Sequence, residues 1–128
     1  MRYMLLVYST QHDAKPEELQ AIADGHRAVI DEAHERGLLL ACDPLKPTST
    51  ATTVRKKDGK PLVSDGPFAE TKEHLAGYYI LDCQNLDEAV EWAKKIPTGC
   101  AGTEGCIEIR PIREMTSPRG PLNHPTTG

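Results

Sequence analysis

The pattern of apolar and polar positions divides the first third of the chain into a strand, a helix and a second strand. Arg2–Tyr8 is almost continuously apolar and rich in β-forming residues, which predicts a strand. From Pro16 to Gly37, apolar side chains recur at spacings of three and four residues, which is typical of an amphipathic helix. Proline suits the first turn of a helix and glycine its C-terminal end. The apolar run Leu38–Leu45 predicts the second strand.

The second half of the chain repeats this order. Ala76–Cys83 is an apolar run that predicts a strand. A helix is expected directly after it, because Asn85 is a good N-cap and Pro97 ends the apolar stripe that follows. Cys106–Arg113 alternates apolar with charged residues, which predicts the last strand.

Between the two halves lies an insertion that the pattern predicts to be a β-hairpin. Val54–Lys57 and Lys60–Ser64 flank Asp58-Gly59, a dipeptide that favours a tight two-residue turn. We assign residues 1–114 to one domain, since 128 residues rarely form two. Residues 115–128 contain three of the ten prolines, so we expect a poorly ordered extension or an arm lying on a partner.

This order of elements favours an α+β fold. Strand, helix, strand, inserted hairpin, strand, helix, strand is the split βαβ pattern of ferredoxin-like folds. Two helices on one face leave the other face bare, yet the strands are too apolar for that face to meet water. We therefore expect a homodimer in which two sheets pack face to face as a dimeric α/β barrel.

Composition and charge narrow the classes of partner. The formal net charge is −4, so direct binding to nucleic acid is unlikely on electrostatic grounds. The longest apolar stretches, Met4–Tyr8 and Leu38–Cys42, are far shorter than a membrane span. The N-terminus has no signal-peptide cleavage pattern, which predicts a cytoplasmic protein whose four cysteines are thiols. The spacing of Cys100 and Cys106 is a weak match to zinc ligands, and no metal is expected.

His26 is the most informative single residue. It occupies a position of the apolar stripe between Ile22 and Val29, so the ring points toward the sheet. Burial favours the neutral ring and a nearby carboxylate favours the charged one, which would poise its protonation near neutral pH. This makes His26 a candidate catalytic residue. The alternative is a core histidine that is hydrogen-bonded to a backbone carbonyl.

Asp65 is the second catalytic candidate. It stands in the run Ser64–Phe68, where a strand ends at a glycine and a proline that make the bend rigid. Its carboxylate could be presented into a cleft, or it could simply cap the turn. Four further residues are candidates for binding a ligand. They are Tyr78, Tyr79, Glu70 and Arg110.

Each of these four has a structural alternative. Tyr78 and Tyr79 face opposite sides of their strand, so we expect one to pack under a helix and the other to lie at the dimer interface or in a cleft. Glu70 could equally belong to a solvated charged loop. Arg110 could equally form a surface ion pair.

Several runs of the sequence resemble one family. The central run Asp65–Glu73, DGPFAETKE, is followed by Leu75–Leu81, LAGYYIL. Together with the opening Met1–Leu6, MRYMLL, and the ending Gly105–Ile112, GCIEIRPI, these runs resemble the DGPF type of the YCII-related superfamily. The resemblance covers about residues 1–114 and rests on the combination of runs.

The resemblance implies a ferredoxin-like fold, a dimeric α/β barrel and a cleft in which a histidine of the first helix lies near an acidic residue. His26 matches that histidine in position. In the YCII-like branch the acid is an aspartate just after the second helix, where this chain reads Lys95-Ile96-Pro97-Thr98 without a carboxylate. Asp65 is our hypothesis for the replacement. One superfamily member is a dehydrochlorinase, and genes of DGPF members often lie beside those of sigma factors.

Two function classes follow. The first is a cofactor-independent enzyme that uses His26 for acid–base chemistry, such as proton transfer or elimination, on a small molecule. The sequence has no Walker loop, GxGxxG, HExxH or GxSxG motif, which argues against nucleotide-driven and serine-hydrolase chemistry. The second class is a non-catalytic module that senses a ligand or binds a partner related to sigma factors or transcription. The fold alone does not separate the two classes.

Overall fold

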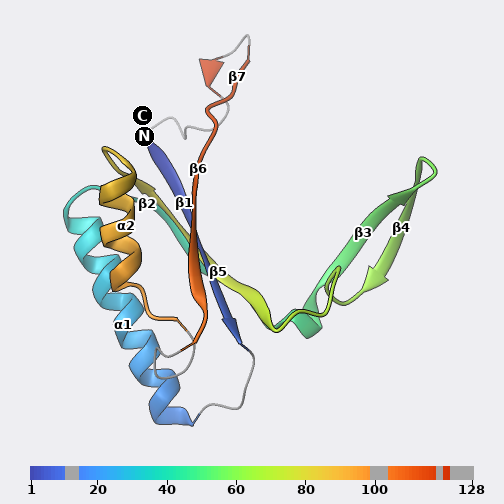
Figure 1. Ribbon diagram of the computed structural model, residues 1–128, viewed down its shortest axis with the longest axis horizontal. Coiled ribbons are helices and arrows are strands. Elements are labelled where there is room, and N and C mark those ends of the chain that lie inside the picture. Colours follow the sequence, from blue (N-terminus) through green and yellow to red (C-terminus); the bar gives the residue numbers. More distant parts are fainter. Residues whose placement is uncertain (11–14, 99–103, 118–119, 122–128) are drawn as a thin grey trace.

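The most apolar runs of the sequence form the centre of a four-stranded antiparallel sheet. In the computed structural model, which describes residues 1–10, 15–98, 104–117 and 120–121, the strand order is β2-β5-β1-β6. The central strands are β1 (Arg2–Thr10) and β5 (Glu73–Asp82), and the edge strands are β2 (Leu39–Pro44) and β6 (Cys106–Pro111) (Figure 1). The central strands are therefore paired on both sides.

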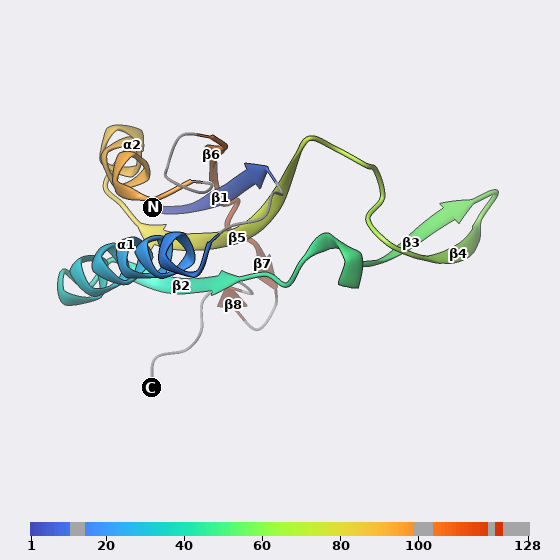
Figure 2. The ribbon, with the colours of Figure 1, turned by 90° about the horizontal axis from the view of Figure 1, so that it is seen from below.

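Two helices lie on one face of this sheet (Figures 1 and 2). The first, α1 (Pro16–Glu35), begins with proline as predicted, and two glutamates in its first turn favour the positive end of the helix dipole. The second, α2 (Leu86–Lys95), is capped by Asn85, whose side-chain oxygen accepts a hydrogen bond from the backbone N–H of Glu88 at 3.0 Å. The mixed architecture is consistent with the predicted ferredoxin-like α+β fold.

The core lies between the helices and the sheet. It is formed by alternate residues of the central strands and by the inner stripes of both helices. Its buried members include Leu5, Val7, Val29, Ala33, Tyr79, Leu81, Ala89 and Trp92. The intervening strand residues Met4, Leu6 and Ile80 are half-buried and point to the opposite side. We call that side, which carries neither helix, the open face of the sheet.

Several element boundaries differ from the sequence prediction, most of all the start of β5. The fifth predicted strand, β5, begins at Glu73 rather than at Ala76. This happens because β1 continues to Thr10 and its last residues pair with Glu73 and His74. The final strand β6 ends at Pro111, two residues before the predicted end.

The predicted hairpin is present, and it leaves the sheet. Among the described residues, its strands β3 (Thr52–Lys57) and β4 (Lys60–Asp65) pair only with each other, in a separate two-stranded sheet. Asp58 and Gly59 both have positive φ, 53° and 78°, as a type I′ turn requires. A short 3-10 helix, Thr48–Thr50, precedes it. We call residues 52–65 the arm, and it extends away from the sheet and both helices (Figures 1 and 2).

The tail contains a small second ribbon. Strands β7 (Thr116–Ser117) and β8 (Gly120–Pro121) pair with each other. The remaining predictions for residues 115–128 fall on 118–119 and 122–128, which lie outside the described residues. The same holds for residues 99–103 of the loop before β6. In the part of the chain that is described, neither helix has the length and apolar character needed to span a bilayer.

Candidate functional site

Helix α1 carries His26 toward the sheet. The ring shares the inner stripe of the helix with Val29 and Ala33, which are both buried, whereas His26 itself is half-buried. One residue earlier, Gly25 leaves room for the ring of Pro97, because a Cβ there would lie 2.8 Å from Pro97 Cγ. The chain after α2 therefore packs directly against the helix turn that holds His26.

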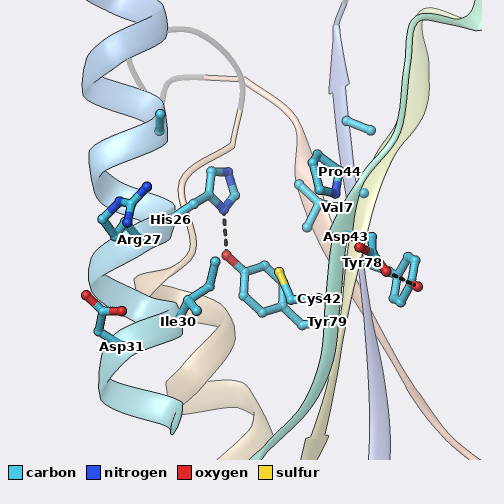
Figure 3. A pocket seen from close by; sticks show the side chains of 13 residues that line it. Val7, His26, Arg27, Ile30, Asp31, Cys42, Asp43, Pro44, Tyr78 and Tyr79 are labelled. Carbon is cyan, nitrogen blue, oxygen red and sulfur yellow. Dashed lines mark hydrogen bonds between the residues drawn. The ribbon is translucent and has the colours of Figure 1, made fainter. Parts of the chain in front are cut away.

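Strand β5 brings Tyr79 beneath this histidine. Tyr79 stands between Leu5 of β1 and Cys42 of β2 in the sheet register, and only 1% of it is exposed. Its hydroxyl oxygen lies 2.6 Å from His26 Nδ1, a short hydrogen bond (Figure 3). The two rings are nearly parallel, with an interplanar angle of 21° and centroids 6.0 Å apart. The sequence thus places an imidazole and a phenol in direct contact across the core edge.

Burial keeps both groups of this pair neutral near pH 7. It lowers the pKa of the His26 ring from its usual value of 6.5, since desolvation disfavours the charged imidazolium. It also raises the pKa of the Tyr79 phenol well above its ordinary range. Desolvation likewise raises the pKa of the Cys42 thiol, which stands beside Tyr79 on the neighbouring strand. The hydrogen bond between His26 and Tyr79 therefore joins two uncharged groups that can exchange donor and acceptor roles.

A cavity of about 420 Å³ opens beside this pair, between α1 and the strands β2 and β5 (Figure 3). Most of its wall is apolar, and Arg27 and Asp31 add exposed charges from α1. The lining residues are Val7, Ala23, His26, Arg27, Ile30, Asp31, Cys42, Asp43, Pro44, Ala76, Gly77, Tyr78 and Tyr79. A small, mainly apolar molecule with one polar group is the kind of ligand that such a cavity holds.

The backbone of β5 passes close to β2 at the cavity wall. Gly77 makes this approach possible, because a Cβ there would lie 2.9 Å from the carbonyl oxygen of Asp43 and 3.2 Å from Pro44 Cα. Both neighbours are backbone atoms, so neither can turn aside. The glycine therefore sets the spacing between the two strands that form the wall.

Tyr78 lies on the other side of the sheet from Tyr79. Its hydroxyl donates a hydrogen bond to Asp43 Oδ2 at 2.7 Å, and the pair points away from His26 (Figure 3). The two tyrosines thus face opposite sides of β5, one under α1 and one on the open face. Tyr78 and Asp43 contribute to the cavity rim, but their polar ends are on the far side of the strands.

The other predicted site residues lie elsewhere in the chain. Asp65 is exposed at the end of β4, where it pairs with Thr52 at the root of the arm. The structure does not bring Asp65 to His26 within one chain, because the hairpin leaves the sheet as a separate ribbon. Glu70 is exposed between β4 and β5, and Arg110 is exposed on β6, paired with Met4. None of these three lines the cavity.

Of the residues that line the cavity, sequence reasoning named only His26, Tyr78 and Tyr79 as site candidates, and it missed the polar or reactive side chains of Cys42, Arg27 and Asp31 among others. Cys42 was read only as part of a strand, although its alternation with Asp43 signals that one of them faces the helices. Arg27 and Asp31 are one helical turn apart on the flank of the apolar stripe that contains His26, which was the available signal. Among the described residues, no cluster of three or more His, Cys, Asp or Glu side chains is arranged to hold a metal ion.

Comparison with known proteins identifies the family of this chain. The family model of the YCII-related domain matches residues 1–116, which include the sheet, both helices and the arm. A protein of Rhizobium meliloti (strain 1021), named only as an uncharacterized protein, is 39% identical over 116 residues. This alignment covers 88% of the present chain and 92% of the relative. The chain therefore belongs to the YCII-related domain family.

Proposed function

We propose that this protein is a cofactor-independent enzyme that performs acid–base chemistry on a small molecule, with His26 as the proton carrier. The observation that carries the proposal is the 2.6 Å hydrogen bond between His26 Nδ1 and the Tyr79 hydroxyl at the wall of an apolar cavity. A proton carrier needs a defined orientation and a pKa suited to neutral pH. The contact with Tyr79 supplies the first, and burial of the ring supplies a neutral base.

Because Nδ1 is held by Tyr79, the hydrogen bond also leaves Nε2 as the ring nitrogen that can exchange a proton with a ligand. When Nδ1–H donates to the Tyr79 oxygen, Nε2 carries the lone pair and can take a proton from a ligand. The phenol hydrogen of Tyr79 is then available for a ligand oxygen. A neutral imidazole would accept the proton as a C–H or O–H bond of the ligand breaks, and the electron pair left behind would expel a leaving group in an elimination. The imidazolium would then return the proton to water or to the product.

The open face of the sheet supports the proposal of a homodimer. Met4, Leu6 and Ile80 present a half-buried apolar strip there, without a helix to cover it. A second copy packed on this face would give the dimeric α/β barrel that the resemblance implies. Multi-angle light scattering tests it directly, because a mass of 14.1 kDa at micromolar concentration contradicts a dimer.

Asp65 remains our hypothesis for the acid that accompanies His26. Its position on the arm sets one condition for this pairing. The carboxylate would have to come from another copy, since within one chain it lies on the arm. An NMR titration of the His26 ring in the wild type and in Asp65→Asn tests this. A shift of the ring pKa on substitution supports the pair, and an unchanged titration contradicts it. The run Asp65–Glu73 is also our reason to place the chain in the DGPF branch.

A non-catalytic role is the second candidate, and the exposed arm is the observation that favours it. In this version the protein senses a ligand in the cavity, or binds a partner related to sigma factors or transcription. Glu70 and Arg110, both exposed, would then belong to a contact surface rather than to a ligand site.

One screen separates the two candidates. Small aromatic and aliphatic hydroxy, keto and halogenated compounds would be screened for binding by ligand-observed NMR and for turnover by mass spectrometry. We expect at least one compound to bind and react in the wild type. Neither His26→Gln nor Tyr79→Phe should retain the full turnover rate, whereas Tyr78→Phe, the matched control, should. Binding without turnover would favour the sensing module, and turnover unchanged in His26→Gln would contradict the proposed mechanism.

A further inference from the structure

The arm does not bury its own side chains. Every residue of β3 and β4 except Thr53 is exposed. The hydrogen bonds at its base connect it to its own root, through Gly66 N–H to the Ala51 carbonyl at 2.7 Å and Thr53 Oγ1 to the Gly66 carbonyl at 2.8 Å. A two-stranded ribbon is at best marginally stable in water without a surface to pack on. The arm therefore has the form of an element that is completed by something outside the chain.

One face of the arm carries an apolar strip. Val54 and Val63 are direct cross-strand partners, so their side chains lie together on the same face. They are 61% and 70% exposed. Pro61 lies two residues from Val63 and so shares this face. An exposed valine pair contributes little to the stability of the fold. Covering it with another surface would be favourable, because apolar area would be removed from water.

The charge of the arm is opposite to that of the rest of the chain. Residues 52–65 contain four basic side chains, Arg55, Lys56, Lys57 and Lys60, against two acidic ones. The remaining residues contain 11 basic and 17 acidic side chains, an excess of six negative charges. The chain thus carries a basic projection on an acidic body.

The negative charge is concentrated on helix α1. Its 20 residues include six acidic side chains and one arginine. Glu17, Asp24 and Glu35 are exposed. Seven positions separate Glu17 from Asp24 and eleven separate Asp24 from Glu35, so the three carboxylates lie along the same side of the helix, opposite the stripe that contains His26. This outer surface of α1 therefore complements the positive charge of the arm.

The complementary surfaces cannot meet within one molecule, because the arm extends away from α1 (Figures 1 and 2). We propose that the arm is a docking element that binds the acidic outer surface of helix α1 in a second copy of this chain. Two copies related by a two-fold axis would exchange two such contacts. Basic side chains of the arm would face the carboxylates of α1. This inference is independent of whether the cavity is catalytic.

Charge reversal gives a direct test. Variant A carries Lys56→Glu and Lys57→Glu in the arm, and variant B carries Asp24→Lys and Glu35→Lys on α1. These positions are exposed and outside the cavity lining, so folding should be retained, which circular dichroism checks. A control with the same charge change as A is Lys46→Glu with Lys94→Glu. Self-association is measured by sedimentation velocity over a range of concentrations.

We expect A and B each to self-associate at least about tenfold more weakly than the wild type and the control, because like charges then meet in both contacts. A mixture of A and B should form the mixed pair preferentially in native mass spectrometry, because both of its contacts are complementary. Added salt should weaken the wild-type pair. Three results would overturn the proposal: a wild type that stays monomeric, random pairing of A with B, or an arm charge reversal that abolishes binding to a DNA duplex while leaving self-association unchanged.

Discussion

Two antiparallel strand pairs in this chain have similar local geometry and very different surroundings. The pair of β1 with β5 buries Leu5 and Tyr79 under the helices, with exposed fractions of 0% and 1%. The pair of β3 with β4 leaves Val54 and Val63 mostly exposed. Both ribbons contain β-branched or aromatic residues in antiparallel pairing, with one register shift between Val7 and Tyr8 of β1. Within the described part of the chain, only the first has helices and neighbouring strands to pack against.

The difference separates two sources of stability. A tight turn and cross-strand pairing are local, and they are sufficient to specify the arm. Burial of side chains is not local, and it holds the central strands and with them the cavity residues. Substitutions in the sheet should therefore change the free energy of unfolding, whereas substitutions in the arm should change association between copies.

The largest contrast is expected for leucines of the two ribbons. Leu5→Ala should lower the free energy of unfolding by about 2–5 kcal/mol, because the side chain is fully buried and leaves a cavity. Leu62→Ala in the arm should change it by less than about 0.5 kcal/mol, since Leu62 is 51% exposed. Urea unfolding of both variants measures the two values. Equal losses would contradict the separation of roles.

A smaller loss of folding stability is expected when the glycine of the cavity wall is replaced. Gly77→Ala should destabilise by about 1–3 kcal/mol, because the added methyl group meets the backbone of β2 and must push the strand away. Ser64→Ala, at an exposed position of the arm, is the control and should cost less than about 0.5 kcal/mol. Thermal unfolding compares them. If Gly77→Ala were as stable as the control, the two strands would be able to separate without cost.

The sequence predicted the elements well because each has a local signal. The proline at the start of α1, the N-cap at Asn85 and the turn at Asp58-Gly59 depend on residues only a few positions apart. The side of α1 that holds His26 followed from helical periodicity. The early start of β5 was missed because it depends on pairing with the end of β1, about 65 residues earlier in the chain.

The site was predicted only in part, for the same reason. His26 and Tyr79 were both named, but their contact depends on how far α1 lies from β5, which no local pattern specifies. Asp65 was proposed as a neighbour of His26 because it follows a rigid bend, and a bend does not say where the hairpin points. The structure places it on the arm because β3 and β4 pair with each other and not with the main sheet.

Adjacent tyrosines of β5 allow a matched comparison of the two sheet faces. Tyr79→Phe should destabilise by about 1–2 kcal/mol, because it leaves His26 Nδ1 without its partner in a half-buried place. Tyr78→Phe removes an exposed hydrogen bond to Asp43 and should cost less than about 0.5 kcal/mol. Urea unfolding gives the energies, and ¹⁵N chemical shifts of the His26 ring report its tautomer. Only Tyr79→Phe should change that tautomer, and a change in Tyr78→Phe instead would contradict the assignment.

The smallest effect is a dependence of stability on pH that comes from His26. Burial lowers the pKa of the folded ring, whereas in the unfolded chain it stays near ~6.5. Above that value the ring is neutral in both states, and the contribution of His26 to the free energy of unfolding is fully present. As the pH falls below it, the unfolded chain binds the proton first, so the free energy of unfolding decreases until the folded ring also titrates. His26→Gln removes this titration and should therefore show a shallower loss of stability as the pH falls below about 6.5. Identical slopes in the wild type and in His26→Gln would mean that the ring is as easily protonated in the fold as in water, and the cavity would then lack the neutral base on which the proposed chemistry depends.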